Sequence, residues 1–179
     1  YEIRLSLVGS EMCIRDSTRT CELLLKKVGT STRPDACDSY CAFSPVKGQE
    51  NMLYIAMAEG NQIWRVDVGN LEGKDKKTYP GEGYAGKAIV EGQIAGKGWE
   101  DGLLRNAKFN NPHQICFTED GKLYIADCGN NCIRVIDTRL SIDKATVSTP
   151  IGLPGMKGYK DGGPDICLLY TSDAADEAR

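Results

Sequence analysis

The feature of this sequence that most constrains its fold is an internal repeat. The tetrapeptide LYIA occurs at residues 53–56 and again at residues 123–126, and at the same offset NQIWRVD (61–67) matches NCIRVID (131–137). Upstream and downstream blocks match as well, Ala42-Phe43 with Cys116-Phe117 and GWEDG (98–102) with GYKDG (158–162). Extra residues separate these blocks only in the first copy, at 45–50 and 74–86. We therefore expect strands in the blocks, loops between them, and a repeat architecture.

The second copy has the pattern of four short strands. Residues 114–118 form an apolar run that ends at Asp120-Gly121, a strong hairpin signal, and the β-rich run 122–126 follows. Residues 132–137 and 145–149 supply a third and a fourth strand. Four short antiparallel strands followed by a glycine-rich crossover predict one blade of an all-β propeller. A blade buries its two faces only against neighbouring blades, so an isolated blade is not expected to be stable.

These residues resemble a known repeat family. PHQICFTEDGKLYIADCGNNCIRVID (112–137), followed by VSTPIG and GYKDG within 147–162, looks like an NHL repeat, whose usual pattern contains F-x-x-P-x-x-I, D-G-x-[LIV]-[YF]-[VI]-A-D and G-N-x-x-I-R. The first copy departs from this pattern, since Met57 replaces the turn aspartate and Asp38 stands where proline is expected. The resemblance implies a partial β-propeller, with about two four-stranded NHL blades and parts of two more from a six-bladed ring.

The repeat and the resemblance divide the chain into segments. Residues 18–36 are expected to end a preceding blade, 37–95 to form a blade with loop insertions, and 96–152 to form the second blade. Residues 153–166 are expected to cross over into a following blade. The segments CAFSP (41–45) and ICF (115–117) are similar to segments of Bacteroidetes proteins that join an IPT/TIG domain to an NHL propeller. That resemblance implies an exported protein of the cell envelope or an outer-membrane lipoprotein.

The two ends of the chain are predicted to be translated sequencing adapter and not native sequence. LVGSEMCIRD (7–16) and CLLYTSDAADE (167–177) resemble the translation of a transposon-tagmentation library adapter. Residues 12–16 can be encoded by ATG TGT ATA AGA GAC flanked by AG, and the reverse complement of that DNA, in a shifted frame, encodes CLLYTS (167–172). Two unrelated ends of one protein are not expected to be antisense copies of one DNA segment. We therefore expect residues 1–17 and 167–179 to be adapter-derived.

Removing these ends changes the composition. The chain has 22 Lys+Arg and 25 Asp+Glu, and the ends contain three basic and six acidic residues, which leaves 19 of each. A neutral segment gives no bulk attraction to nucleic acid, so a nucleic-acid partner is not expected. No apolar run is long enough to span a membrane. Six of the eight cysteines remain, and Cys128 and Cys132 flank a tight turn, where either a disulfide or packed thiols would fit.

Three sets of residues are candidates for contacts or turns. His113 is the sole histidine, and it begins the inner strand of a blade, near the channel. Its setting resembles segments that supply zinc ligands in the peptidyl-hydroxyglycine lyase, but a catalytic zinc takes about three protein ligands and the matching residue in the first copy is Ser39. A channel-lining or core histidine is the other reading. Asp127 and Asn131 bracket the hairpin turn and are predicted to be structural, with a calcium site as the alternative.

The crossovers carry two equivalent aromatic residues, Trp99 and Tyr159. If these rings are exposed they offer a stacking surface for a sugar or peptide; if they are buried they join neighbouring blades, which is the reading we favour. The paired glycines around them lack the strand before and helix after that a phosphate-binding loop requires.

No catalytic constellation, resident metal or cofactor is evident in this segment, although Ca or Zn would fit a complete propeller. The sequence favours a binding or scaffold module for a protein or glycan partner, associated with the cell envelope, and expects contacts with further blades of its own chain. The alternative is a propeller enzyme of the lactonase or lyase type, with channel-metal ligands mostly outside this segment. A weaker third reading, RNA binding, would need a basic face.

Overall fold

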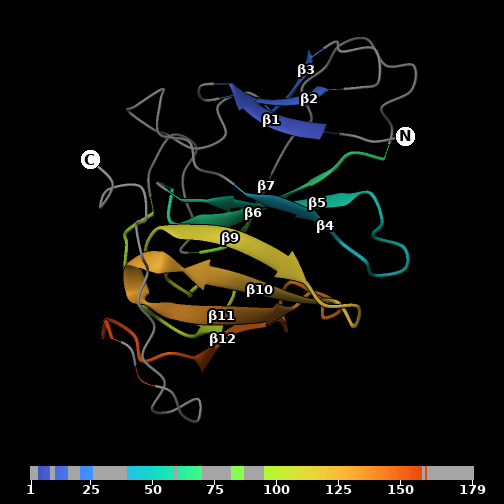
Figure 1. Ribbon diagram of the computed structural model, residues 1–179. Helices are drawn as coiled ribbons and strands as arrows, with labels where there is room; N and C mark the ends of the chain where they lie inside the picture. Colours follow the sequence, from blue (N-terminus) through green and yellow to red (C-terminus); the bar gives the residue numbers. More distant parts are fainter. Residues whose placement is uncertain are drawn as a thin grey trace.

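A computed structural model describes residues 4–8, 11–15, 21–25, 40–58, 60–69, 82–86, 95–158 and 160 of the chain. Within these residues the fold is all-β, with three antiparallel sheets and one short 3-10 turn, η1 (Cys128–Asn130) (Figure 1). Among the described residues, no helix is long and apolar enough to cross a membrane. The predicted all-β, partial-propeller architecture is confirmed.

The first sheet contains β1 (Arg4–Val8), β2 (Glu11–Arg15) and β3 (Cys21–Leu25), in that order. Strands β1 and β2 lie in the residues predicted to be adapter-derived, and β3 lies in the segment assigned to a preceding blade. Pairing of these strands does not test the origin of the residues, so the adapter assignment stays a prediction.

The second sheet is a four-stranded antiparallel meander. It contains β4 (Cys41–Phe43), β5 (Met52–Met57), β6 (Gln62–Asp67) and β7 (Glu82–Ala85) in sequence order. Strand β7 lies inside the stretch 74–86 that the repeat comparison treated as a loop insertion. It pairs with the free edge of β6, and this pairing buries the apolar side chains of Tyr84 and Ala85.

The third sheet is the second blade. It contains β8 (Gly102–Leu103), β9 (Pro112–Phe117), β10 (Lys122–Asp127), β11 (Cys132–Asp137) and β12 (Thr146–Ile151), in the order β8-β12-β11-β10-β9. The blocks of the repeat occupy equivalent register positions, since Ile55 pairs with Trp64 in the first blade and Ile125 with Arg134 in the second. Four strands were expected here; β8 is a fifth, which the crossover adds to the outer edge by pairing with β12.

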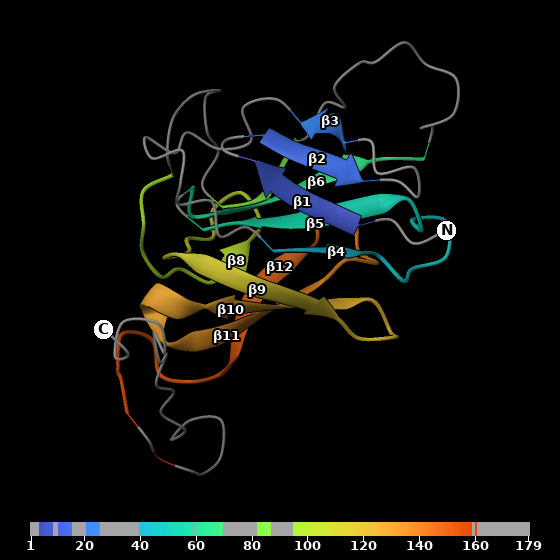
Figure 2. The ribbon, with the colours of Figure 1, turned by 45° about the horizontal axis from the view of Figure 1, so that its top comes forward.

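The two blades pack through one hydrophobic core, with the inner strands β4 and β9 side by side (Figures 1 and 2). The core joins apolar side chains of both sheets and of the crossover, among them Tyr54 and Ile63 from the first blade, Leu123 and Ile125 from the second, and Phe109 before β9. The Tyr54 ring makes edge contacts with Tyr84 and with Phe117, at centroid separations of 5.0 and 5.2 Å. The contact between Tyr54 and Phe117 crosses between the blades and contributes to their packing.

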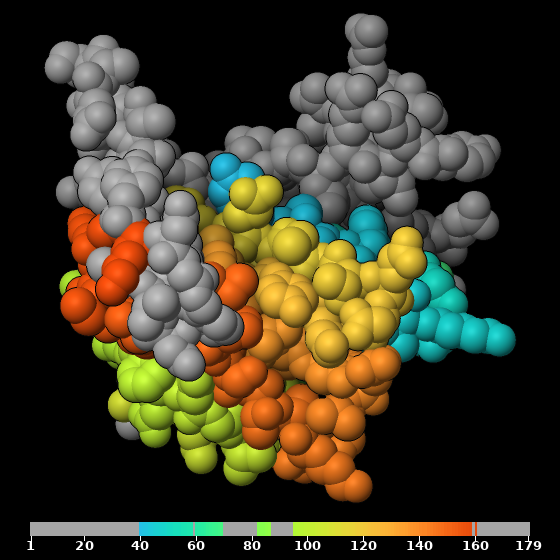
Figure 3. All heavy atoms as spheres, turned by 60° about the horizontal axis from the view of Figure 1, so that its bottom comes forward, coloured from blue at the N-terminus to red at the C-terminus, as the bar shows by residue number. Residues whose placement is uncertain are grey.

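The second blade has one covered face and one that is only partly covered. In β10 and β11 buried and half-buried residues alternate, whereas in β5 five consecutive residues are buried. We call the partly covered surface the open face; its apolar residues on the inner three strands are Cys116, Tyr124, Ala126, Ile133 and Val135. Figure 3 looks onto this side of the blade, where yellow and orange side chains lie at the surface. Successive side chains of a strand point to opposite faces of the sheet, so the half-buried apolar residues all lie on one face. A partly exposed apolar face of this kind indicates a surface that packs against another layer.

Candidate functional site

The two ends of the blades differ in chemistry. At one end strands β4 and β9 begin and the β5–β6 and β10–β11 turns lie; we call it the asparagine end. Three asparagines there, Asn61, Asn111 and Asn131, adopt left-handed backbone conformations with φ of 53°, 55° and 55°. Asparagine tolerates this conformation better than most residues because its short side chain bonds locally. The turn sequences therefore fix sharp chain reversals at this end.

The predicted candidate His113 lies at the asparagine end, beside an aromatic residue that the sequence did not single out. Its half-buried ring, on the second residue of β9, lies 6.4 Å from the ring of Tyr40, with an angle of 37° between the planes. Tyr40 directly precedes β4, its carbonyl accepts the Ala56 N–H at 2.8 Å, and its side chain is 49% exposed. Neighbouring blades thus place two rings together, both accessible to solvent. Ser39, the residue matched to His113, lies outside the described residues.

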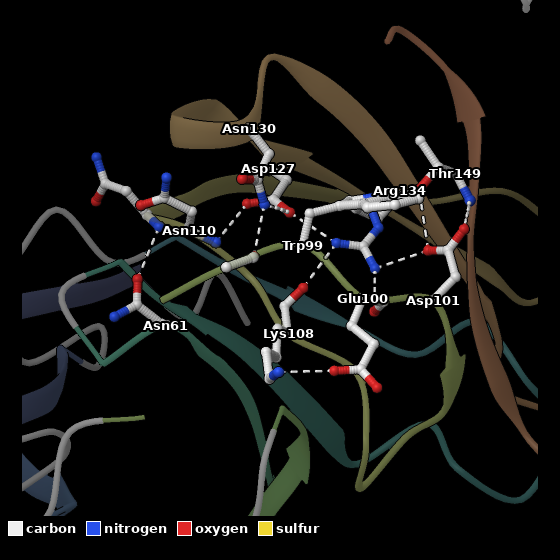
Figure 4. A network of polar contacts seen from close by, with 12 residues as sticks. Asn61, Trp99, Glu100, Asp101, Lys108, Asn110, Asp127, Asn130, Arg134 and Thr149 are labelled. Carbon is white, nitrogen blue, oxygen red and sulfur yellow. Dashed lines mark hydrogen bonds and ion pairs between the residues drawn. The ribbon is translucent and has the colours of Figure 1, made fainter. Parts of the chain in front are cut away.

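The asparagine end also links the two blades through polar contacts. The Oδ1 atom of Asn61 accepts the backbone N–H of Asn111 at 2.9 Å (Figure 4). Its Nδ2 donates to the carbonyl of Ala95 at 3.1 Å. Asn131 is buried, and its backbone N–H donates to the carbonyl of Cys128 at 3.1 Å. A buried amide that satisfies backbone groups of a neighbouring segment fixes the position of that segment. Residues 110–113 are therefore held against the first blade.

Arg134 is the centre of a buried polar network that the sequence did not predict (Figure 4). Its Nη1 donates to the Asp127 carboxylate and to the Lys108 carbonyl, and its Nη2 donates to the Asp101 carboxylate and to the Glu100 carbonyl, each at 2.8 Å. The guanidinium also lies over the Phe109 ring, 4.9 Å from its centroid. A fully buried arginine needs such pairing to offset its desolvation. The network ties the crossover to the blade that follows it.

The predicted turn residue Asp127 belongs to this network. Its Oδ1 accepts the Asn110 N–H and its Oδ2 accepts from Asn130 and Arg134, all at 2.8 Å. Burial raises the pKa of the Asp127 carboxyl, while the Asn110, Asn130 and Arg134 donors oppose that rise. This buried carboxylate therefore has three donors within the protein, the Asn110 N–H, the Asn130 amide and the Arg134 guanidinium, and its side chain is fully removed from solvent.

The predicted crossover aromatic Trp99 is half exposed and hydrogen-bonded to the outer strand. Its side chain is 48% exposed, and its Nε1 donates to the Thr149 hydroxyl at 3.0 Å. The same hydroxyl lies 2.9 Å from the Asp101 carboxylate, which also accepts the Thr149 N–H at 3.1 Å. Trp99 is therefore not the buried link between blades that we favoured from the sequence; its ring joins the crossover to β12 of the same blade and leaves about half of its surface in solvent. Its equivalent, Tyr159, lies outside the described residues.

Metal and disulfide chemistry at the site can be assessed from the side chains present. In the part of the chain that the structure describes, no three His, Cys, Asp or Glu side chains group as metal ligands. His113 offers one nitrogen ligand among the described residues, whereas a catalytic zinc takes about three protein ligands. Cys128 and Cys132 are free thiols, and burial raises the pKa of Cys132 to about 12. A thiol with that pKa is protonated and unreactive near neutral pH.

The repeat in the second blade matches a known family model. Residues 109–136 match the NHL repeat. The match spans the Phe109 ring under Arg134, the whole of β9 and β10, and β11 through Ile136. The NHL signature therefore coincides with the strands and the arginine network of the second blade.

Two curated relatives share sequence with parts of the chain. The chain is 34% identical over 89 residues to the protein SUPPRESSOR OF QUENCHING 1, chloroplastic, of Arabidopsis thaliana, covering 49% of this chain and 8% of that protein. It is 30% identical over 98 residues to cyclochlorotine synthetase of Talaromyces islandicus, covering 54% of this chain and 2% of that protein. The similarity thus involves a small part of each relative.

Solved structures share the fold over nearly the whole chain. An auxiliary nutrient binding protein from Bacteroides thetaiotaomicron superposes with a TM-score of 0.69 at 20% identity, covering 94% of this chain and 38% of that chain. An auxiliary nutrient binding protein from Bacteroides ovatus gives a TM-score of 0.67 at 20% identity, covering 90% of this chain and 36% of that chain. At this identity the likeness is one of fold. The chain spans less than two fifths of the length of these structures.

The sequence analysis singled out His113 as a candidate contact and Asp127 as a turn residue. It did not single out Tyr40, Asp101 or Arg134. A signal for Arg134 was present, because the first blade has Trp64 at its position and Met57 at the position of Asp127. The acid and the base are replaced together, which is expected if they contact one another. Tyr40 had no such signal, since its approach to His113 depends on how two sheets pack.

Proposed function

We propose that this chain is part of a propeller that acts as a binding module, with its ligand at the asparagine end. The observation that carries the proposal is the pairing of the accessible Tyr40 and His113 rings from adjacent inner strands. Binding sites for small molecules and glycans combine aromatic side chains with a few polar groups that orient the ligand. The buried acid and base of the second blade are bonded to each other and to backbone, so they serve the fold.

The partner class and location of the module are part of the same proposal. We propose a protein or glycan partner and a place in the cell envelope, as an exported protein or lipoprotein related to IPT/TIG–NHL proteins. Auxiliary nutrient binding proteins of two Bacteroides species share the fold, which supports this reading. Further blades would pack on the open face. Asp127 and Asn131 are proposed as structural turn residues, and Trp99 and Tyr159 as equivalent aromatic residues of the crossovers.

A ligand screen with product analysis separates binding from the enzymatic alternative of a lactonase or lyase. The full chain is incubated with oligosaccharide and peptide libraries, its melting temperature is recorded, and the library is assayed by mass spectrometry before and after. A ligand at about 100 times its Kd should stabilise the chain by about 2.7 kcal/mol and be recovered unchanged. Conversion of a library member to product, together with zinc or calcium retained after dialysis, would overturn the binding proposal.

A further inference from the structure

We propose that the asparagine end binds a neutral saccharide, with one sugar ring stacked on the exposed face of Tyr40 and hydrogen-bonded by the His113 imidazole. This inference rests on the proposed binding function and narrows its ligand class. A pyranose presents an apolar C–H face and a polar rim of hydroxyls. A phenol ring with an accessible face and a neighbouring imidazole match those two surfaces, because the ring packs against the C–H groups while the imidazole exchanges hydrogen bonds.

Backbone hydrogen bonds hold the main chain of both residues in place before any ligand binds. Tyr40 is anchored by the hydrogen bond from Ala56 to its carbonyl, and His113 lies within β9, which is paired with β10. The turn before His113 is held by the Asn61 amide on the Asn111 N–H. A site that is already ordered loses little conformational entropy on binding.

A second polar group lies at the position equivalent to Tyr40. Cys41 pairs with Ile55 and Ile115 pairs with Ile125, so Tyr40 in the first blade corresponds to Gln114 in the second. Gln114 is exposed at the inner edge of its sheet. A carboxamide both donates and accepts, which suits a sugar hydroxyl that does the same. Adjacent blades thus present a ring and an amide at matching positions.

The distribution of charge favours a neutral ligand over an acidic or basic one. Among the described residues, the polar neighbours Asn61, Asn111 and Gln114 are uncharged. The Asp127 carboxylate at this end is buried and paired with Arg134. At the opposite end of the second blade the charged side chains gather in pairs, Lys122 with Asp120 at 3.1 Å and Arg139 with Asp137 at 2.6 Å. A charged peptide or a nucleic acid is recognised by side chains of opposite charge. The uncharged neighbours of Tyr40 and His113 do not provide such a charge.

Calorimetry on the complete propeller of which this chain is proposed to be part tests the proposal, with maltohexaose, cellohexaose and mannohexaose as neutral probes and hexagalacturonate as the acidic probe. We expect at least one neutral hexasaccharide to bind and hexagalacturonate to bind more weakly or not at all. The variant Tyr40→Ala should weaken binding at least about tenfold, whereas Tyr40→Phe, which keeps the ring, should stay within about threefold of the parent. Phe43→Ala is the matched control, because Phe43 is a partly exposed ring (37%) at the other end of the same strand.

His113→Gln provides a second and conservative variant, expected to weaken binding several-fold while the far-ultraviolet circular dichroism stays unchanged. The inference is overturned if no neutral hexasaccharide binds, if hexagalacturonate binds as tightly, or if both Tyr40→Ala and His113→Gln bind like the parent. A peptide ligand bound by the same chain, with no saccharide binding, would end this inference and leave the binding function standing. Turnover of any probe would end both.

Discussion

Arg134 and Asp127 form an ion pair of 2.8 Å in which both side chains are fully removed from solvent. The pair lies where β10 and β11 approach the hairpin turn, and Asp101 from the crossover completes it on the other side of the guanidinium. The first blade has Met57 and Trp64 in the two places, so one fold accommodates either an ionic or an apolar pair. This relationship leads to the first of four predictions.

Breaking the pair from one side should destabilise the chain strongly. Asp127→Ala leaves Arg134 buried without its main counter-charge, and we expect a loss of about 3–5 kcal/mol in the free energy of unfolding. The double variant Asp127→Met with Arg134→Met, which replaces the ion pair with apolar side chains, should lose less than the single variant Asp127→Met or Arg134→Met; with the parent, these make a cycle of four proteins. Denaturant unfolding of the four proteins gives the coupling energy. Additive losses would show that the two side chains do not depend on each other.

The left-handed turn at Asn131 should accept glycine and resist other residues. Its φ of 55° is strained for a residue with a Cβ that cannot bond locally. We expect Asn131→Ala to cost about 1–2 kcal/mol in unfolding free energy and Asn131→Gly to cost less. Asn106→Ala, at an exposed position with ordinary backbone geometry, should change it by no more than about 0.5 kcal/mol. Equal losses for Ala and Gly would assign the effect to the side-chain contacts of Asn131 instead.

Stability should fall with acid through Asp137. Hydrogen bonds from Arg139 lower the pKa of the Asp137 carboxyl from 3.8 to about 2. Because the folded pKa lies below the unfolded one, this stabilisation is complete above pH 3.8 and is lost as the pH falls toward 2. Asp137→Asn should therefore flatten the decline of unfolding free energy in this window. Arg139→Met should flatten it as well, and an unchanged slope in both variants would remove Asp137 as its cause.

The open face should drive association. Expressed alone, residues 17–166 expose this apolar surface and unpaired strand edges, so we expect oligomers or partial unfolding in sedimentation experiments. Tyr124→Lys combined with Val135→Lys should reduce the association, because both residues lie on the open face. Leu140→Lys, at an exposed position in the turn after β11, should leave it unchanged. A monodisperse monomer that melts cooperatively would contradict the prediction that the chain needs further blades.

The sequence alone was sufficient for the local structure of the blades. Strand positions follow from alternating apolar residues, and the turns follow from asparagine and glycine, so the pattern in 112–137 predicts β9, β10 and β11 closely. These are interactions between residues near one another in the chain. The same reasoning failed at β7 and β8, since each forms only because a sheet edge is available to pair with.

Only the tertiary structure decided what the blades bring together. Asp101 and Arg134 are far apart in sequence and meet because the crossover packs against the following blade. Tyr40 and His113 meet because the inner strands of two sheets lie side by side, and a shift of one residue in either register would turn a ring to the other side. The repeat thus determined the blades, whereas the contact of Arg134 with Asp101 and the candidate site depend on long-range packing that no local pattern encodes.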